Sequence, residues 1–304
     1  MNLPKKIQIR EVGPRDGLQA EKNLVSTENK IELINRIFKC NIRMIEATSF
    51  VNPRAIPQLS DAEQVITRIN RPVDSVVSAL VGNSRGVQRA IRAGVEEIQV
   101  VISASEEHNR RNVNMDIIKS IQQLEGVVPE AFQSGVVVRA AIATAFGCPF
   151  EGEISIKQVL WLVGVFLEMG IKQVTLADTA GLGDPLLVSR VVGEIWNRYP
   201  NIELALHFHD TRGLGLANSL AGMQSGVTIL EASLGGLGGC PFIPKATGNI
   251  ATEDLVFMCE KMGVDTNVQL EEMLETARWL EKVIGRELPG RVMKAEASES
   301  CTPI

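Results

Sequence analysis

Short apolar runs rich in β-branched residues recur along the chain, and helix-like patterns fill most of the gaps between them. Strands that alternate with helices predict parallel βαβ units. Eight such units, strand first, predict a closed (β/α)8 TIM barrel, for which about 250 residues are typical. We expect the strands at residues 7–12, 44–48, 75–80, 98–102, 136–143, 173–177, 203–207 and 228–232. We expect the helices between them at residues 27–40, 61–70, 84–93, 115–125, 156–169, 185–197 and 214–224.

The chain continues beyond the last predicted strand. Its pattern from residue 250 onward predicts two further helices, at 252–262 and 269–284. Because we find no linker and no low-complexity segment, we expect residues 1–304 to form a single barrel domain with 250–290 as appended helices. The alternative fold is an open doubly wound sheet. No GxGxxG motif follows the first strand, which disfavours the dinucleotide-binding version of that fold.

Composition excludes several classes of protein. With 45% apolar and 22% charged residues, the 304-residue chain can bury a full core. Its net charge of -5 argues against nucleic acid as a partner. The longest apolar run, 159–167, is about half of a ~20-residue membrane span, so we expect no membrane partner. The five cysteines are scattered without a CxxC motif, and the N-terminus has no apolar signal core, so we expect a cytoplasmic protein with free thiols.

Two of the three histidines lie one residue apart, in Leu206-His207-Phe208-His209-Asp210. On a strand, side chains at i and i+2 point to the same face, so His207 and His209 are expected to project together from the strand end. Two imidazoles on one side of a strand end can hold a metal ion. The alternative is that both are polar residues bonded to neighbouring carbonyl groups.

Other polar side chains follow predicted strands, where a barrel places its active site. Arg15, Asp16 and Gln19 follow the first strand, and Asp178 follows the sixth. Glu46 is embedded in the apolar second strand, so it must be paired or functional if it faces inward. The alternatives are an Arg15–Asp16 pair in solvent and an outward-facing Glu46 paired with a helix lysine.

The loop after the eighth strand reads Gly-Gly-Leu-Gly-Gly-Cys-Pro over residues 235–241, and a polar run leads on to Asn249. A loop this rich in glycine packs little, so we expect a mobile lid with a reactive Cys240 at its tip. The alternative is a structural turn with an incidental cysteine.

The side chains at these strand ends suggest one type of chemistry. Imidazole, carboxylate and amide donors suit a divalent cation such as Mg²⁺, Mn²⁺ or Zn²⁺. A cation beside a guanidinium favours a reaction that builds an enolate, so the predicted reaction makes or breaks a carbon–carbon bond next to a carbonyl. The sequence has no Ser–His–Asp pattern, phosphate loop or Cys₄ cluster.

Five segments together resemble the 3-hydroxy-3-methylglutaryl-CoA lyase family, one of the metal-dependent barrel lyases that also include isopropylmalate synthase and 4-hydroxy-2-oxovalerate aldolase. They are residues 11–19, 45–51, 206–210, 236–241 and 248–254, and the resemblance extends from about residue 7 to about residue 264. The Arg-Asp-Gly and His-x-His elements are shared by the superfamily. The Glu-Val-Gly-Pro opening and the Gly-Gly-Leu-Gly-Gly-Cys-Pro loop are narrower and point to the lyase.

This resemblance implies a role for each matching residue. It implies that a divalent cation is held by Asp16, His207, His209 and Asn249. It implies that Arg15 stabilises the enolate, that Cys240 is the acid/base, and that Glu46 and Asp178 are supporting polar groups of the catalytic site. The family reaction cleaves 3-hydroxy-3-methylglutaryl-CoA to acetyl-CoA and acetoacetate, in leucine degradation. We also expect substrate contacts from Arg15, Gln19, Ser49, Thr179 and Asn112.

The sequence departs from the family pattern at Pro244, Lys245 and Arg212, and residues 103–114 are unusually charged. These positions lie near the substrate in the family, so a lyase for another 3-hydroxyacyl-CoA is an alternative. A Claisen-type synthase or aldolase of the same superfamily is a second alternative. Those relatives generally lack the glycine-rich lid, and the long synthases carry a regulatory domain for which this chain ends too soon. A non-catalytic barrel that serves as a scaffold is a third.

Several residues have weaker functional signals. Arg85 and Arg139 either meet CoA phosphates or a carboxylate, or are solvated or paired in the core. Asn112 and Asn114 either contact the thioester or cap a turn. We expect His108 at the surface and Cys301 as a free thiol in a frayed end. The family resemblance also implies an acyl-CoA substrate and a second copy of the chain in a homodimer as partners.

Overall fold

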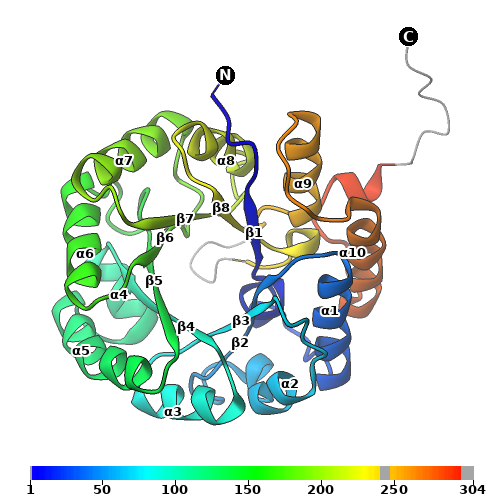
Figure 1. Ribbon diagram of the computed structural model, residues 1–304, viewed down its shortest axis with the longest axis horizontal. Coiled ribbons are helices and arrows are strands. Elements are labelled where there is room, and N and C mark those ends of the chain that lie inside the picture. Colours follow the sequence, from blue (N-terminus) through cyan, green and yellow to red (C-terminus); the bar gives the residue numbers. More distant parts are fainter. Residues whose placement is uncertain (1, 240–246, 296–304) are drawn as a thin grey trace.

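Eight parallel strands form a closed barrel in the computed structural model, which describes residues 2–239 and 247–295 (Figure 1). Each strand pairs with its sequence neighbours, and β8 pairs with β1 to close the ring. The strands are β1 (Gln8–Glu11), β2 (Met44–Ser49), β3 (Val76–Leu80), β4 (Glu97–Ser103), β5 (Val137–Ala143), β6 (Gln173–Asp178), β7 (Glu203–Phe208) and β8 (Ile229–Ala232).

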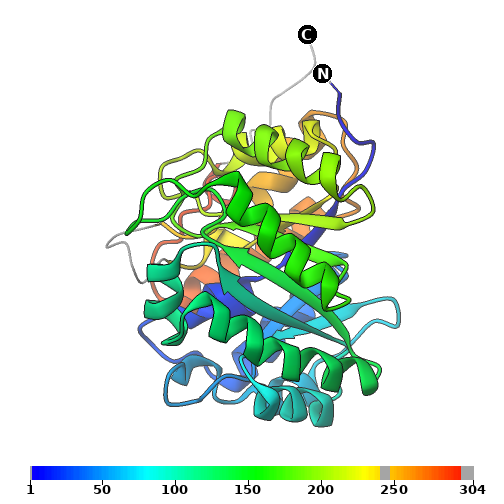
Figure 2. The same ribbon diagram turned by 90° about the vertical axis from the view of Figure 1, so that its left-hand side faces the viewer.

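Helices surround the strands, as the view turned by 90° also shows (Figure 2). They are α1 (Thr27–Lys39), α2 (Ala62–Arg68), α3 (Ser84–Ala93), α4 (Glu106–Val113), α5 (Ile117–Gln133), α6 (Ile156–Glu168), α7 (Pro185–Arg198), α8 (Gly215–Gln224), α9 (Thr252–Lys261) and α10 (Leu270–Ile284). Short turns of helix, η1 (Gly13–Gly17), η2 (Pro57–Leu59), η3 (Leu234–Gly236) and η4 (Val292–Lys294), lie between or after them.

Local chemistry sets the ends of several helices. Ser26 caps α1 by accepting a hydrogen bond from the Asn29 N–H, and Asp184 caps α7 with Pro185 in its first turn. α3 ends at Gly94, whose φ of 81° is the left-handed conformation that glycine tolerates best. These caps fix where each helix leaves and rejoins the barrel.

The predicted TIM barrel is confirmed, and each predicted strand overlaps an observed one. Two predictions about helices were incomplete. α5 runs on to Gln133, past the expected end at 125, and α4 was not predicted at all. α4 has no apolar stripe, which is why a search for helical periodicity missed it.

The last two helices complete the outer ring between α8 and α1 (Figure 1). α10 packs on α1, where Cys40 Sγ lies 3.6 Å from Thr276 Oγ1 and the Gln269 N–H donates to the Cys40 carbonyl. α9 contacts η3, the turn that follows β8. The predicted helices at 252–262 and 269–284 are therefore present and hold the two ends of the barrel wall together.

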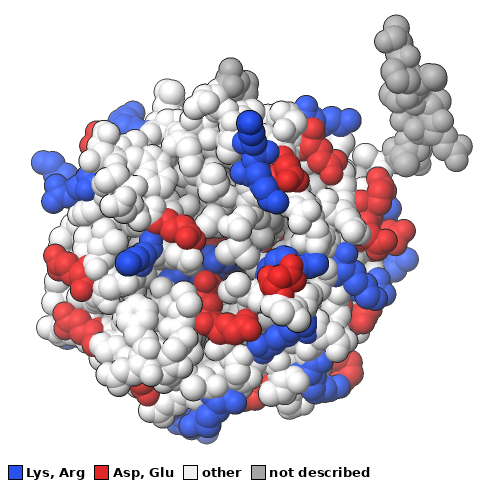
Figure 3. Space-filling view, in the orientation of Figure 1, with Lys and Arg blue, Asp and Glu red and all other residues white. Residues whose placement is uncertain are grey.

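On the face shown in Figure 3, basic and acidic side chains are interspersed rather than gathered by sign. None of the helices within residues 2–239 and 247–295 combines the length and apolarity that a membrane span requires. Cys40, Cys148 and Cys259 are buried free thiols.

Candidate metal centre and active site

His207 and His209 project from the end of β7 toward one point, as the strand period predicts. Their Nε2 atoms lie 3.1 Å apart, and both residues are 6% exposed. The Nδ1 atom of His207 lies 3.2 Å from Glu231 Oε2. Burial and the neighbouring His207 lower the pKa of His209 to about 4, so its imidazole is neutral and free to act as a ligand at neutral pH.

Asp16 reaches the same point from η1, the π-helical turn after β1. The Val12 carbonyl accepts the N–H groups of Arg15, Asp16 and Gly17, which coils the chain tightly here. Such π-turns are frequent at functional sites. A side chain at Gly13 would place its Cβ 2.6 Å from Glu11 Oε1, so the carboxylate of Glu11 would have to move.

The carboxylate of Asp16 lies close to both imidazoles. Its Oδ2 atom is 3.8 Å from His209 Nε2 and 4.0 Å from His207 Nε2. Burial alone would raise the pKa of Asp16, but Arg15 and the two histidines outweigh burial and hold that pKa at about 2. Asp16 is therefore an anion at neutral pH.

Asn249 completes the cluster from a segment far along the chain. Residues 208–210 and 248–250 run side by side: the Ile250 N–H donates to the Phe208 carbonyl, and the Asp210 N–H donates to the Gly248 carbonyl. Gly248 has a φ of 84°, and a Cβ there would lie 2.5 Å from the Gly238 backbone. Asn249 Nδ2 donates to Asp16 Oδ2 at 2.9 Å.

The cluster fits a divalent cation. One ligand atom each from Asp16, His207 and His209 lies within 4.8 Å of the others. Asn249 Oδ1 is buried and accepts no hydrogen bond from any described residue, so a strong acceptor is left facing inward. The 3.1 Å between the imidazole nitrogens matches the ~3 Å expected for adjacent ligands with ~2.1 Å bonds. These donors suit Mg²⁺, Mn²⁺ or Zn²⁺.

Arg15 lies beside this cluster and is held from two sides. Its Nε and Nη2 donate to the two oxygens of Glu46 at 2.9 and 3.0 Å, and its Nη1 donates to Asp16 Oδ1 at 2.5 Å. Burial would lower the pKa of Arg15, but Glu46 and Asp16 raise it overall, so the guanidinium stays charged. Glu46 faces inward and is fully buried, as one of its two predicted orientations required.

A layer of buried charges lies next to Glu46, and the sequence reasoning missed most of it. Arg139 Nη2 donates to Glu46 at 3.1 Å, Arg139 Nη1 donates to Glu231 at 2.8 Å, and Arg139 Nε is 2.9 Å from Glu97. Arg10 pairs with Glu97 at 3.2 Å and with Glu231 at 3.4 Å. The signal was available, because these residues, like Glu46, are charged positions inside apolar strands.

Asp178 is fully buried at the end of β6 and accepts hydrogen bonds from the backbone of the loop that follows. Its oxygens receive the N–H groups of Leu182 at 2.8 Å and Gly183 at 2.9 Å. Burial raises the pKa of Asp178, although these two bonds oppose the rise. Arg212, one of the departures from the family pattern, donates to the carbonyls of Ala180 and Gly181 in the same loop.

The residues predicted to contact the substrate differ in their burial and in their hydrogen bonds. Ser49 is buried at the end of β2, and its Oγ has no hydrogen-bond partner within the described chain. Gln19 is partly buried just after η1, and Thr179 Oγ1 accepts the Thr144 N–H at 3.0 Å. Asn112 is exposed on α4, and Asn114 ends that helix with a φ of 56°, which is the capping role that we considered.

The predicted lid is only partly described. Cys240, Pro244, Lys245 and Cys301 lie outside the described residues. The beginning of the glycine-rich loop is not loosely packed, contrary to our expectation. Gly235 and Gly236 are buried in η3, and the Gly235 N–H donates to Glu253 Oε2 at 2.9 Å.

His108 is not at the surface, so that prediction was wrong. Its side chain is buried, its ring lies 6.5 Å from the Phe150 ring, and burial lowers its pKa to about 4. Charged neighbours on the outer face of α4 hid its inward orientation. Arg139 is paired in the core and Arg85 is exposed on α3, in agreement with the core-paired and solvated alternatives.

The comparisons with known proteins match this geometry. The family model described as HMGL-like matches residues 6–280. The chain belongs to the HMGL-like family. A relative named hydroxymethylglutaryl-CoA lyase YngG, from Bacillus subtilis, is 45% identical over 291 residues, covering 96% of this chain and 97% of the relative.

Solved structures of lyases agree with the family. The crystal structure of the Bacillus subtilis HMG-CoA lyase superposes with a TM-score of 0.94 at 44% identity, covering 96% of this chain and 98% of that one. An HMG-CoA lyase from Acinetobacter baumannii, in complex with coenzyme A and 3-methylmalate, has a TM-score of 0.93 at 43% identity, covering 99% and 98%. The HMGL-like match contains the four predicted metal ligands and Arg15.

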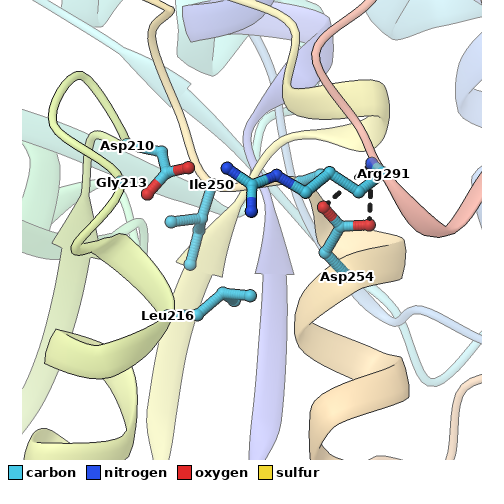
Figure 4. Close-up of a pocket in the computed structure, with 7 residues that line it drawn as sticks. Asp210, Gly213, Leu216, Ile250, Asp254 and Arg291 are labelled. Atoms are coloured by element: carbon cyan, nitrogen blue, oxygen red, sulfur yellow. Dashed lines mark hydrogen bonds between the residues drawn. The ribbon is translucent and has the colours of Figure 1, made fainter.

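A cavity of about 40 Å³ lies between Asp210, Ile250, Asp254 and Arg291 (Figure 4). The Arg291 guanidinium reaches across it toward Asp210, and Asp254 accepts the Arg291 N–H at 3.0 Å. A space of this size holds a water molecule or two and no organic ligand. We therefore assign this cavity a structural role, tying the C-terminal segment to α9.

Proposed function

We propose that this protein is a divalent-metal-dependent lyase that cleaves 3-hydroxy-3-methylglutaryl-CoA to acetyl-CoA and acetoacetate. One observation carries the proposal: Asp16, His207, His209 and Asn249 converge beside Arg15 at the carboxyl ends of the strands. A lyase named for this substrate is 45% identical over 291 residues, which is 96% of this chain. Mg²⁺ and Mn²⁺ are the expected ions, with Zn²⁺ as the other candidate for this donor set.

Asp16, His207, His209 and Asn249 would hold the ion, which supplies a Lewis acid that lowers the pKa of the substrate hydroxyl. Cys240, as the acid/base, would accept the hydroxyl proton as a thiolate, and the tertiary carbon becomes a ketone as the carbon–carbon bond breaks. The electron pair moves onto the thioester fragment as an enolate. Arg15 lies where that negative charge develops, and its bonds to Glu46 fix the guanidinium before the reaction begins.

The enolate must take up a proton to leave as acetyl-CoA. We assign this proton to the Cys240 thiol, and we assign substrate contacts to Gln19, Ser49, Thr179 and Asn112. Asp178 would act by holding the loop that carries Thr179, because its carboxylate already binds the backbone of that loop. Exposed Asn112 can contact only the part of an acyl-CoA that reaches α4.

The test is acetoacetate formation from 3-hydroxy-3-methylglutaryl-CoA with Mg²⁺ or Mn²⁺. We expect turnover by the native protein and a loss of about 10²-fold or more in Cys240→Ala, the range of a general acid. Cys259→Ala, which changes a buried thiol on α9, is the matched control and keeps its activity. Equal turnover by native protein and Cys240→Ala would remove the proposed role of that thiol.

A second substrate has specific support. The Acinetobacter baumannii lyase was solved with coenzyme A and 3-methylmalate, whose thioester would cleave to propionyl-CoA and glyoxylate by the same chemistry. Arg212 and the charged helix α4 distinguish this chain from the family pattern near the expected acyl site. Comparing kcat/KM for the two thioesters decides between them, and a higher value for 3-methylmalyl-CoA would replace the first assignment.

Further features of the proposal concern the protein as a whole. We infer a single catalytic domain over residues 1–304, a homodimer, a cytoplasmic location and a role in leucine degradation. Light scattering of the purified protein tests the dimer, because a mass near 33.1 kDa would identify a monomer instead. Growth of a deletion strain on leucine as the carbon source tests the metabolic role.

A further inference from the structure

The barrel interior holds charged side chains where apolar layers are usual. Arg10, Glu97, Arg139 and Glu231 are each at most 4% exposed at the side chain. Burying so many charges carries a large desolvation cost, and well-packed apolar residues often stabilise a core equally well. Stability alone therefore explains the presence of these buried charges poorly. Their contacts with the metal cluster and with Glu46 suggest a second role.

Glu231 lies against the ring nitrogen of His207 that points away from the metal cluster. Its Oε2 is 3.2 Å from His207 Nδ1, and a carboxylate in that position requires a hydrogen on Nδ1. The lone pair is then left on Nε2, which faces His209 and Asp16. The other oxygen of Glu231 is held by Arg139 at 2.8 Å and by the Thr175 hydroxyl at 3.0 Å, so the carboxylate cannot easily turn away.

Arg139 connects this carboxylate to the other half of the site. One terminal nitrogen of its guanidinium donates to Glu231, and the other donates to Glu46 Oε2 at 3.1 Å. Glu46 in turn binds Arg15 with both oxygens. The contacts therefore run without a break from His207 through Glu231, Arg139 and Glu46 to Arg15.

We propose that Glu231 and Arg139 are positioning residues, through which one buried guanidinium sets both the ligand nitrogen of His207 and the orientation of Arg15. Neither residue belongs to the expected metal ligands. The inference rests on the proposed metal-dependent function, because it gives His207 its role as a ligand.

The same layer offers a matched control. Glu97 is buried to a similar degree and pairs with Arg139 at 2.9 Å and with Arg10 at 3.2 Å. Among the described residues, no hydrogen bond or ion pair joins Glu97 to His207, Glu46 or Arg15. Glu97→Gln therefore removes a charge from the layer without removing the carboxylate that faces His207.

The experiment measures Mn²⁺ binding to substrate-free protein by electron paramagnetic resonance, together with kcat, KM and thermal unfolding. We expect Glu231→Gln to weaken Mn²⁺ binding 10- to 100-fold, the range seen when an outer partner of a metal-bound histidine is lost. We expect Glu97→Gln to change it less than about 3-fold, although both variants lose thermal stability. Arg139→Lys, which keeps the charge but loses the fork, should lower kcat with a smaller change in KM.

Glu231→Asp keeps the negative charge on a side chain that is one methylene shorter. It replaces Glu231→Gln in the experiment if Glu231→Gln does not fold. It should bind Mn²⁺ more weakly than the native protein and more tightly than any folded Glu231→Gln. Native-like Mn²⁺ affinity in every folded Glu231 variant, or an equal loss in Glu97→Gln, would overturn the positioning role. Native protein that binds Mn²⁺ but cleaves neither thioester would overturn the proposed function alone, and absence of Mn²⁺ binding would overturn both.

Discussion

The metal cluster and the charged layer beside it are both buried and polar, yet they are built differently. In the layer, each of Arg10, Glu97, Arg139 and Glu231 has an opposite charge within 3.4 Å. In the cluster, neither Asn249 Oδ1 nor His209 Nδ1 forms a hydrogen bond with a described residue. The layer pairs its charges with one another, although Arg10 Nη2, Arg139 Nε and Glu97 Oε1 form ion pairs without hydrogen bonds, whereas the cluster leaves the Asn249 Oδ1 acceptor unpaired beside Asp16. The difference separates charges that are paired with one another from polar groups that are left to bind a ligand.

The largest expected effect comes from removing one of the proposed metal ligands. We expect His209→Ala to lower kcat about 10⁴-fold, or about 5 kcal/mol of transition-state stabilisation, because an open ligand position leaves the ion loosely held. The free energy of unfolding should fall by less than that. Steady-state kinetics and urea unfolding of the same sample measure both.

His108→Ala, a second buried histidine away from the cluster, should keep the native Mn²⁺ affinity. If His209→Ala lost stability but kept its activity, the cluster would be structural like the layer beside it.

In the charged layer, by contrast, we expect a substitution to lower the free energy of unfolding. Arg139→Met leaves three carboxylates with one cationic partner fewer, and we expect unfolding to become easier by about 3–5 kcal/mol. Urea unfolding measures this loss. Arg85→Met, the same change at an exposed arginine, should have almost no effect. A loss of under ~1 kcal/mol in Arg139→Met would contradict a layer locked by its charges.

Glu11 is an intermediate case, a fully buried carboxylate without a cationic partner among its described contacts. It accepts hydrogen bonds from the Gly13 and Leu234 N–H groups and from the Thr252 hydroxyl. Burial raises its pKa to about 7, so the native state keeps a proton that the unfolded chain has released. Stability is therefore greatest below about pH 4.5 for this group and is lost as the pH rises to about 7.

Glu11→Gln should remove up to about 3 kcal/mol of that pH dependence, since each pKa unit corresponds to about 1.36 kcal/mol. Unfolding measured between pH 5 and pH 8 tests the change. The exposed Glu28→Gln should retain the native slope. An unchanged slope in Glu11→Gln would show that Glu11 is ionised throughout this range.

The smallest expected effect comes from adding the ion. Mn²⁺ at about 100 times its Kd should stabilise the native protein by about 2.7 kcal/mol, and a chelator should reverse the gain. Thermal unfolding should show a rise of several degrees in Tm. Because the layer needs no ion, Glu97→Gln should show the same rise from its lower starting point, whereas His209→Ala should show almost none.

Much of the barrel could be predicted because its strands are continuous apolar runs, buried on both faces. The metal ligands could be predicted because a barrel brings the carboxyl ends of its strands together, whatever their distance in sequence. α4 was missed although Ser105 caps it and Glu106 and Arg110 pair across one turn. Those are signals of capping and charge, and our search followed apolar periodicity.

The charged positions of the layer are visible within the apolar strands, but their orientation could not be predicted from the sequence. Whether Arg139 or Glu231 faces inward depends on the register of each strand, and a one-residue shift turns a side chain to the opposite face. The burial of His108 likewise depends on how α4 sits over Phe150. The role of Cys240 rests on residues outside the described part of the chain, and it stays a prediction.

Asn249 owes its place to the short pairing of residues 248–250 with residues 208–210, and the glycine-rich turn on the other side is fixed by Glu253. Both borders of the intervening stretch are thus anchored independently of what lies between them. The metal ligand on one border and the end of the barrel wall on the other therefore hold their positions through contacts of the described residues alone.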